Sequence, residues 1–261
     1  MKKQLILHIG THKTGSTSLQ RFLVDHAAAL GRHGIALYRG QLREDNHVEL
    51  HLAALRYDRD TFRKQFNNAG ITFDERFTQQ VAERVQHFIR ARPEPRILFT
   101  SEGLSWLRHD DEIDRLRTIL DIGNHEATAI VYLRNKAEFL RSYIHQLYKV
   151  QGRGPAREYW STRYIEPDTW LVDYEALIKL YQKAFGANNV IVIDYDEALD
   201  KESNIIPSFL RVLDVDPNQF DFASYFLNTT DPANQRKPPR SKPWIARLRN
   251  PLMNWRKRRA A

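Results

Sequence analysis

The sequence predicts an α/β fold, a three-layer sandwich in which helices cover both faces of a mainly parallel sheet. Two observations support this prediction. Short apolar runs of strand length alternate with longer segments whose apolar residues recur at helical spacing. The chain has 261 residues, 42% of them hydrophobic, which is enough to bury the core of one such domain. We expect one domain over residues 1–235, with a helical insertion at about 41–92, and a separate tail over 236–261.

The first strand and the turn after it form the most informative segment. Leu5–Ile9 is apolar and ends at Gly10, where the backbone can bend freely. From Ser16 onward the apolar residues recur at helical spacing, so a short turn connects strand and helix. The peptide N–H groups of Gly15, Ser16 and Thr17 then lie at a helix N-terminus, where unpaired donors and the helix dipole attract phosphate.

This turn has the glycine spacing of a P-loop but not its lysine. The pattern G-x-x-x-x-G-K-[ST] places Lys directly after the second glycine, whereas here Ser16 follows Gly15 and the lysine is Lys13. Lys13-Thr14-Gly15-Ser16-Thr17 after a strand resembles the 5′-phosphosulfate loop of sulfotransferases that use 3′-phosphoadenosine 5′-phosphosulfate (PAPS). The resemblance implies a P-loop-containing fold in which Lys13 neutralises charge on the oxygen between sulfur and phosphorus. The 5′-phosphate would be bound by Thr14, Gly15, Ser16 and Thr17. An ordinary turn with a solvated lysine is the alternative.

The segment over residues 41–86 reads as mostly helical and separates the first strand-helix unit from the next strand. We expect this segment to form part of the wall of the site that binds the molecule to be sulfated. His47 and His51 are four residues apart, as metal ligands on a helix would be, but a third ligand is missing. We therefore expect surface histidines here and no metal site.

The second clear strand brings a candidate general base. Arg96–Thr100 is a strand-length run, and Glu102 follows it at the carboxyl end, where α/β sheets place their ligands. Sulfo transfer to a hydroxyl requires a base, and the resemblance to sugar sulfotransferases favours a glutamate in this position. His12 is the second candidate, because its ordinary pKa of about 6.5 suits proton transfer and Lys13 favours its neutral form. Glu102 could instead pair with an arginine or cap the next segment.

A third strand carries the candidate site for a second phosphate. Ala129–Leu133 is apolar and ends at Arg134, whose guanidinium can bind two phosphate oxygens at once. A helix follows, with Ser142 eight positions after Arg134. This pattern resembles the 3′-phosphate motif of the same sulfotransferases, which implies that Arg134 and Ser142 bind the 3′-phosphate. Lys136 stands where that family often has Pro. In the alternative interpretation, Arg134 pairs with a carboxylate and Ser142 has no binding role.

The remaining segments resemble the family only in outline. Ile191–Asp196 is a strand that ends in Tyr and an acid. The aromatic residues of Gln151–Pro167 suit either stacking on sugar rings or packing of a loop. Arg236 and Lys237 are the nearest counterpart of a C-terminal loop that touches the 3′-phosphate, although Pro238 stands where glycine would be.

The tail accounts for the whole net positive charge of the chain. Residues 236–261 hold ten of the 40 lysines and arginines and no acid, together with Trp244 and Trp255. This composition suits peripheral contact with an anionic membrane, and equally a solvated basic terminus. The charge is not accompanied by a sequence motif of a known nucleic-acid-binding fold, so we expect no nucleic-acid partner. The chain has no cysteine, and Met1 leads directly into the first strand, so we expect a cytoplasmic protein, peripheral at the inner membrane face if the tail binds lipid.

Together the two phosphate motifs imply a PAPS-dependent sulfotransferase. We expect in-line transfer of the sulfo group, without a metal, to a hydroxyl of a carbohydrate or glycolipid acceptor, with PAPS as co-substrate. A P-loop kinase or NTPase is one alternative, although it lacks the lysine at position 16. A non-catalytic lipid- or polyanion-binding protein that uses the basic tail is the other.

Overall fold

The structure is a computed structural model, which describes residues 2–59, 69–151 and 169–225. Its strands are β1 (Gln4–His8), β2 (Ile35–Leu37), β3 (Arg96–Thr100), β4 (Glu126–Leu133) and β5 (Val190–Asp194). Its α-helices are α1 (Ser16–Asp25), α2 (Ala27–Arg32), α3 (Val48–Ala54), α5 (Glu75–Ala91), α6 (Asp110–Ile119), α7 (Lys136–Gln151), α8 (Tyr174–Phe185), α9 (Tyr195–Glu202) and α10 (Ile206–Val212). Short 3-10 helices are η1 (Glu102–Trp106), η3 (Trp170–Val172), η4 (Ala187–Asn189) and η5 (Pro217–Gln219).

The strands described form one parallel five-stranded sheet in the order β2-β3-β1-β4-β5. The predicted parallel sheet is therefore confirmed. β1 lies at its centre, and its last residue, His8, pairs with Thr100 on one side and Ile130 on the other. Because the strands are parallel, the segments that follow β1, β3 and β4 all leave the same edge of the sheet.

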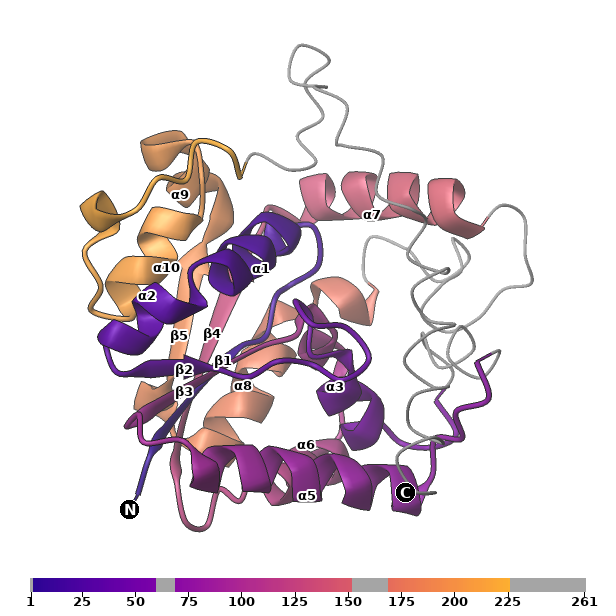
Figure 1. Ribbon diagram of the computed structural model, residues 1–261. Coiled ribbons are helices and arrows are strands. Elements are labelled where there is room, and N and C mark those ends of the chain that lie inside the picture. The colour runs from indigo at the N-terminus through magenta and orange to yellow at the C-terminus, as the bar shows by residue number, and fades with distance from the viewer. Residues whose placement is uncertain (1, 60–68, 152–168, 226–261) are drawn as a thin grey trace.

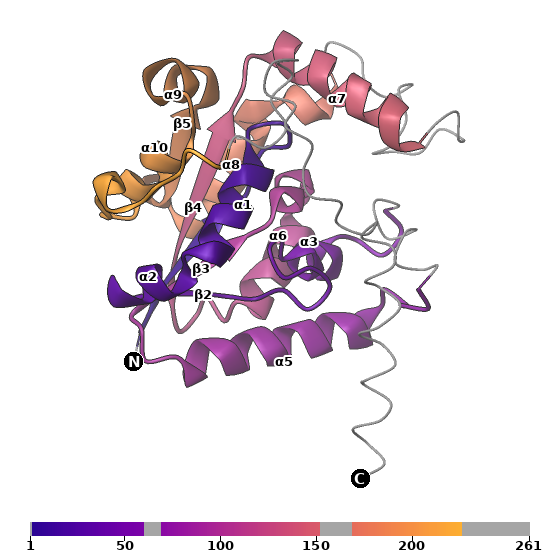
Figure 2. The ribbon, with the colours of Figure 1, turned by 45° about the horizontal axis from the view of Figure 1, so that its top comes forward.

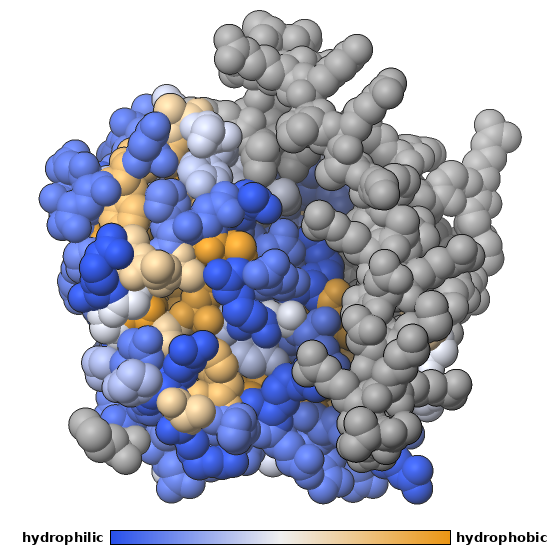
Figure 3. All heavy atoms as spheres, in the orientation of Figure 1, coloured by the Kyte–Doolittle hydropathy of each residue, from blue (hydrophilic) through white to orange (hydrophobic). Residues whose placement is uncertain are grey.

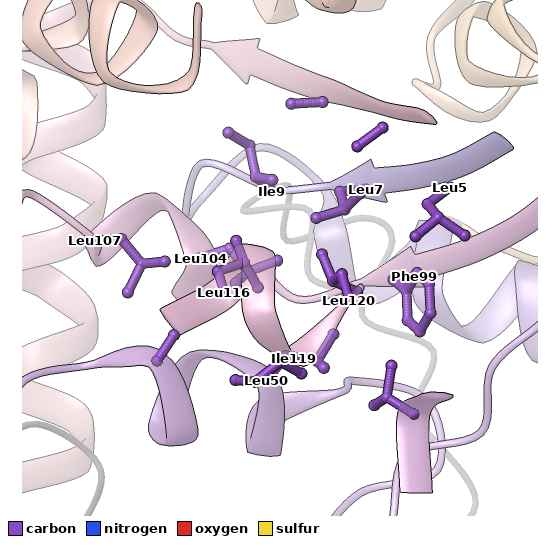
Figure 4. Packing of buried hydrophobic residues seen from close by; sticks show 14 of the residues in the cluster. Leu5, Leu7, Ile9, Leu50, Phe99, Leu104, Leu107, Leu116, Ile119 and Leu120 are labelled. Atoms are coloured by element: carbon purple, nitrogen blue, oxygen red, sulfur yellow. The ribbon is translucent and has the colours of Figure 1, made fainter. Parts of the chain in front are cut away.

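Helices cover both faces of the sheet, as expected for a three-layer sandwich (Figure 1). Successive residues of a strand point to opposite faces. Leu5 and Leu7 accordingly join an apolar cluster with side chains of α3, α5, α6 and α8, whereas Ile6 joins a second cluster with side chains of α1, α2 and α10. Figure 4 shows the first cluster, in which side chains of β1, β3, α3, η1 and α6 meet. These two buried layers hold β1 rigidly, so the loop at its end has a fixed base.

The helix after β4 stands apart from this packing. α7 extends from the carboxyl edge of the sheet, on the opposite side of the molecule from α5 in both ribbon views (Figures 1 and 2). The described part of the surface in Figure 3 is mostly hydrophilic, and its apolar patches gather on the side of α1, α2 and α10. Nothing among the described helices is long and apolar enough to cross a membrane.

The helical insertion contains α3 and α5, which pack on one face of the sheet. The prediction that His47 and His51 lie on the surface is wrong, because both are buried. The Nδ1 of His47 accepts a hydrogen bond from the peptide N–H of Thr100 at 3.0 Å, and the Nδ1 of His51 lies 3.2 Å from the Ser101 hydroxyl. The two imidazoles therefore fasten the insertion to the end of β3.

Several expectations concern parts of the chain outside the residues that the structure describes. These are the aromatic loop over 151–167, apart from Gln151, the pair Arg236 and Lys237, and the basic tail over 236–261.

Candidate active site

Two glycines shape the turn after β1. Gly10 has a φ of 98°, and a Cβ there would lie 3.1 Å from the Cα of Glu102. Gly15 has a φ of 73° and precedes α1, and a Cβ there would lie 3.3 Å from Ile205. Both positions require the left-handed backbone that glycine adopts without strain. Gly10 also allows the backbone at Glu102 to approach the loop closely.

The loop is held together by hydrogen bonds to Thr11. The peptide N–H and the hydroxyl of Thr11 donate to the carbonyl of Tyr132 in β4, at 3.0 and 3.1 Å. The Thr11 carbonyl in turn accepts hydrogen bonds from the hydroxyls of Thr14, at 2.6 Å, and Ser16, at 3.3 Å. The hydroxyl protons of Thr14 and Ser16 are thus used within the loop, and their contribution to an anion site would come from the backbone.

The N-terminus of α1 is open to a ligand. Its N-cap residue, Gly15, has no side chain to cap it, and Thr17 in its first turn is exposed. The first N–H groups of a helix have no acceptor within the helix, and the helix dipole adds partial positive charge at this end. The loop therefore presents peptide donors at the position where the sequence predicts the 5′-phosphate.

Arg134 lies directly against this loop, although it is 121 residues away in sequence. Its Nη1 donates a hydrogen bond to the carbonyl of Lys13 at 3.2 Å. Glu138 and Asp196 each lie 3.8 Å from the guanidinium, which stands 5.3 Å above the ring of Tyr195. The Arg134 guanidinium therefore lies beside the backbone of the predicted 5′-phosphate loop at the carboxyl edge of the sheet.

Ser142 is less closely associated with this region. It lies half-buried on α7, two turns after Arg134, and its hydroxyl makes no hydrogen bond to any residue that the structure describes. The structure thus joins Arg134 to the loop through a direct contact and Ser142 only through the helix that carries it.

The two candidate bases face each other. The His12 Nε2 lies 3.9 Å from the Glu102 Oε1. The His12 ring is stacked on Trp106, with a centroid distance of 4.3 Å and 5° between the planes. The His12 side chain is 4% exposed and that of Glu102 is 25% exposed. Glu102 is therefore the member of the pair that an acceptor in solvent can reach, and His12 lies behind it.

Burial keeps His12 neutral. Desolvation is the main reason that the pKa of His12 is lowered; the charge on Glu102 raises it, and the charge on Lys13 lowers it further. A neutral imidazole fixed by Trp106 can hydrogen-bond its surroundings without adding charge beside the loop.

Two aromatic residues, Trp106 and Tyr143, lie against His12. Trp106, Tyr143 and Tyr174 belong to an apolar cluster beneath α7, and the Tyr143 ring stands edge-on to His12 at 6.1 Å. Burial raises the pKa of the Tyr143 hydroxyl, and the Glu102 charge adds to this. Trp106 lies four residues after Glu102 in a short apolar run, and this run was the signal that could have identified it.

His8, which ends β1, makes the fold sensitive to acid. It is fully buried, its Nδ1 lies 2.8 Å from the Thr100 hydroxyl, and burial lowers its pKa from 6.5 to about 3. Between these values the unfolded chain binds a proton that the folded chain does not. The free energy of unfolding is therefore fully retained above pH 6.5 and falls as the pH drops below it, by about 2 kcal/mol at pH 5 from this residue.

We expect His8→Gln to reduce the difference between the free energies of unfolding at pH 7.5 and pH 5, measured by urea titration, by about 2 kcal/mol. His87→Gln, at an exposed position of α5, should leave that difference unchanged. An unaltered difference in the His8 variant would contradict the assignment of a neutral, buried imidazole.

The fold was compared with known proteins. No protein-family model and no curated protein sequence matches the chain. A sulfotransferase from Alicyclobacillus acidocaldarius has a similar structure, with a TM-score of 0.56 and 16% identity over 89% of this chain and 88% of that one. The sulfotransferase domain of the Synechococcus PCC 7002 olefin synthase gives a TM-score of 0.48 and 12% identity, over 96% of this chain and 88% of that domain. Given its parallel sheet with helices on both faces, this chain has the fold of the Alicyclobacillus acidocaldarius sulfotransferase.

Proposed function

We propose that this protein is a PAPS-dependent sulfotransferase that transfers the sulfo group to a hydroxyl of a carbohydrate or glycolipid. The observation that carries the proposal is the 3.2 Å hydrogen bond from Arg134 to the carbonyl of Lys13. The guanidinium of one predicted phosphate motif thus contacts the backbone of the other beside the N-terminus of α1, which supports a nucleotide with phosphates on both its 5′ and 3′ positions. A nucleotide with a single phosphate chain would need only one of these groups.

The residues fit the donor in chemical terms. The N–H groups of Gly15, Ser16 and Thr17, with the neighbouring Thr14, would bind the 5′-phosphate. Arg134 would bind the 3′-phosphate, and its Nε is buried without a hydrogen-bond acceptor among the described residues, so one donor remains available. Ser142 would add its hydroxyl to the same phosphate. Lys13 would neutralise the oxygen that leaves sulfur, and the proposal therefore assigns charge neutralisation to protein side chains rather than to a metal ion.

Glu102 would act as the general base. As the acceptor oxygen bonds to sulfur, its proton passes to the Glu102 carboxylate, and the bond between sulfur and the bridging oxygen breaks to leave adenosine 3′,5′-bisphosphate. In-line transfer requires the acceptor on the side of sulfur opposite the leaving oxygen. His12 would position the carboxylate from behind, because it is neutral, buried and stacked on Trp106.

We expect calorimetry to show that adenosine 3′,5′-bisphosphate binds more tightly than ATP. Arg134→Gln should weaken the bisphosphate by about 10- to 100-fold, the range for hydrogen bonds to charged groups, while the affinity for adenosine 5′-monophosphate stays within about twofold. Arg141→Gln, on the exposed side of α7, is the matched control and should bind like the unaltered protein. Tighter binding of ATP than of the bisphosphate would instead favour a P-loop kinase or NTPase.

The acceptor class is tested separately from the donor. Incubation with labelled PAPS and an extract of envelope glycans and glycolipids should place the label on a sugar hydroxyl. Label on protein or on a sugar-free lipid would overturn the carbohydrate assignment without affecting the donor site.

A further inference from the structure

A cation that makes no ion pair with a described residue follows the candidate base by six positions in the sequence. Arg108 follows η1 and is half-buried, with its Nη2 donating to the carbonyl of Trp170 at 3.2 Å and its guanidinium 4.9 Å from the centre of the Trp170 ring. Its Nε is buried and has no hydrogen-bond acceptor among the residues that the structure describes. These contacts fix the plane of the guanidinium, and its Nε–H makes no hydrogen bond within the described residues.

The carboxylate of Glu112, whose oxygen accepts a hydrogen bond from the Arg108 peptide N–H, already forms an ion pair with another arginine. Glu112 is completely buried and lies 2.7 Å from the Nη1 of Arg59 through both of its oxygens. It also accepts hydrogen bonds from the peptide N–H groups of Arg56, Arg108 and His109. Within the described ranges, no carboxylate lies within 4.0 Å of the Arg108 guanidinium. Arg108 therefore makes no direct ion pair with a described residue, and the charges of Asp173 and Glu112 act on it only from farther away.

Such a charge is costly. Burial lowers the pKa of Arg108 to about 10, which shows that the environment disfavours its cation. A desolvated guanidinium is stabilised when a carboxylate, sulfate or phosphate takes its parallel N–H groups. The cluster thus has the chemistry of an anion site.

Contacts connect this cluster to the candidate base. Arg59 Nη1 donates to the Trp106 carbonyl at 3.1 Å, and the Trp106 ring is stacked on His12, which faces Glu102. Arg59 also lies 5.7 Å from the Trp170 ring that Arg108 covers. The Arg108 cluster is therefore linked to the candidate base through Arg59, Trp106 and His12.

We propose that Arg108 and Trp170 bind an anionic group of the acceptor, so that the enzyme sulfates an acidic carbohydrate or glycolipid rather than a neutral one. The bound group is a carboxylate, sulfate or phosphate on the acceptor molecule, and Arg108 is a specificity-determining residue. This inference rests on the proposed function and narrows its substrate class.

The test uses the full chain saturated with adenosine 3′,5′-bisphosphate, so that anions cannot bind at the donor loop. Calorimetric titration compares D-glucuronate, D-glucose 6-sulfate and D-glucose 6-phosphate with neutral D-glucose. We expect at least one anionic sugar to bind tenfold or more tightly than glucose, and Arg108→Gln to abolish that preference. Arg108→Lys, which keeps the charge but loses the planar fork, should retain part of it. Arg117→Gln, at an exposed position of α6, should retain all of it.

The outcomes separate this inference from the proposed function. If the bisphosphate does not bind, the proposed function fails. If the bisphosphate binds but every anionic sugar binds no better than glucose, or if Arg108→Gln keeps the preference while still binding the bisphosphate normally, only the anion site is overturned. Because bisphosphate binding is measured in the same samples, an unfolded variant cannot be mistaken for a negative result.

Discussion

Lys13→Ala is expected to lower kcat by about 10²- to 10³-fold, the loss usually caused by removing one group that stabilises transition-state charge. Negative charge grows on the oxygen between sulfur and phosphorus as the bond to sulfur breaks. Lys13 is in the turn between β1 and α1, with a left-handed backbone (φ 63°) and its carbonyl held by Arg134. These contacts fix the backbone from which the Lys13 side chain extends, so we expect that a lysine elsewhere cannot replace it.

The measurement is the rate of labelled sulfo transfer from PAPS to the acceptor found in the extract. The affinity for adenosine 3′,5′-bisphosphate should fall only by about tenfold in this variant, because the charge that Lys13 offsets is larger in the transition state than in the product. Lys201→Ala, in an exposed ion pair on α9, is the control and should be fully active. Equal losses in kcat and in bisphosphate affinity would mean that Lys13 only binds the nucleotide.

Glu102→Gln is expected to lower kcat by about 10²- to 10⁴-fold, the usual contribution of a general base. The substitution keeps the size of the side chain and the close approach of the Glu102 backbone to Gly10. It removes the ability to accept the proton of the acceptor hydroxyl. Bisphosphate affinity should stay within about twofold of the original, because the proposal places the two phosphates on Thr14–Thr17 and Arg134 rather than on Glu102.

The comparison with His12 decides the roles of the pair. His12→Asn should cost about tenfold in kcat, less than Glu102→Gln, since His12 is 4% exposed and acts through the carboxylate. Glu75→Gln, in the exposed first turn of α5, should have no effect. A larger loss in the His12 variant than in the Glu102 variant would transfer the role of base to the imidazole.

Local patterns predicted the strands and the turn well. β3 has the predicted bounds, and β1 and β5 differ from their predicted limits by a residue or two. β4 begins three residues before the predicted run, because Glu126 and Thr128 interrupt its apolar pattern. β2 was not predicted, since a three-residue strand is too short to show a period.

The histidines show where sequence reasoning failed. The spacing of His47 and His51 matches an exposed helix face as well as a buried one, and their polar side chains favoured the surface. They are buried because the end of β3 supplies hydrogen-bond partners at Thr100 and Ser101, and these partners lie about 50 residues away in the sequence. The aromatic environment of His12 was missed for the same reason.

The sequence by itself determined the local elements of this protein: a buried strand, a turn with two essential glycines and a helix that begins directly after this turn. Such elements depend on residues close together in the chain. Only the tertiary structure decided that Arg134 lies against Lys13, that His12 lies behind Glu102 and that Arg108 makes no ion pair with another described residue. Each of these results from parallel strands ending at one edge of the sheet, which joins side chains that no local pattern relates.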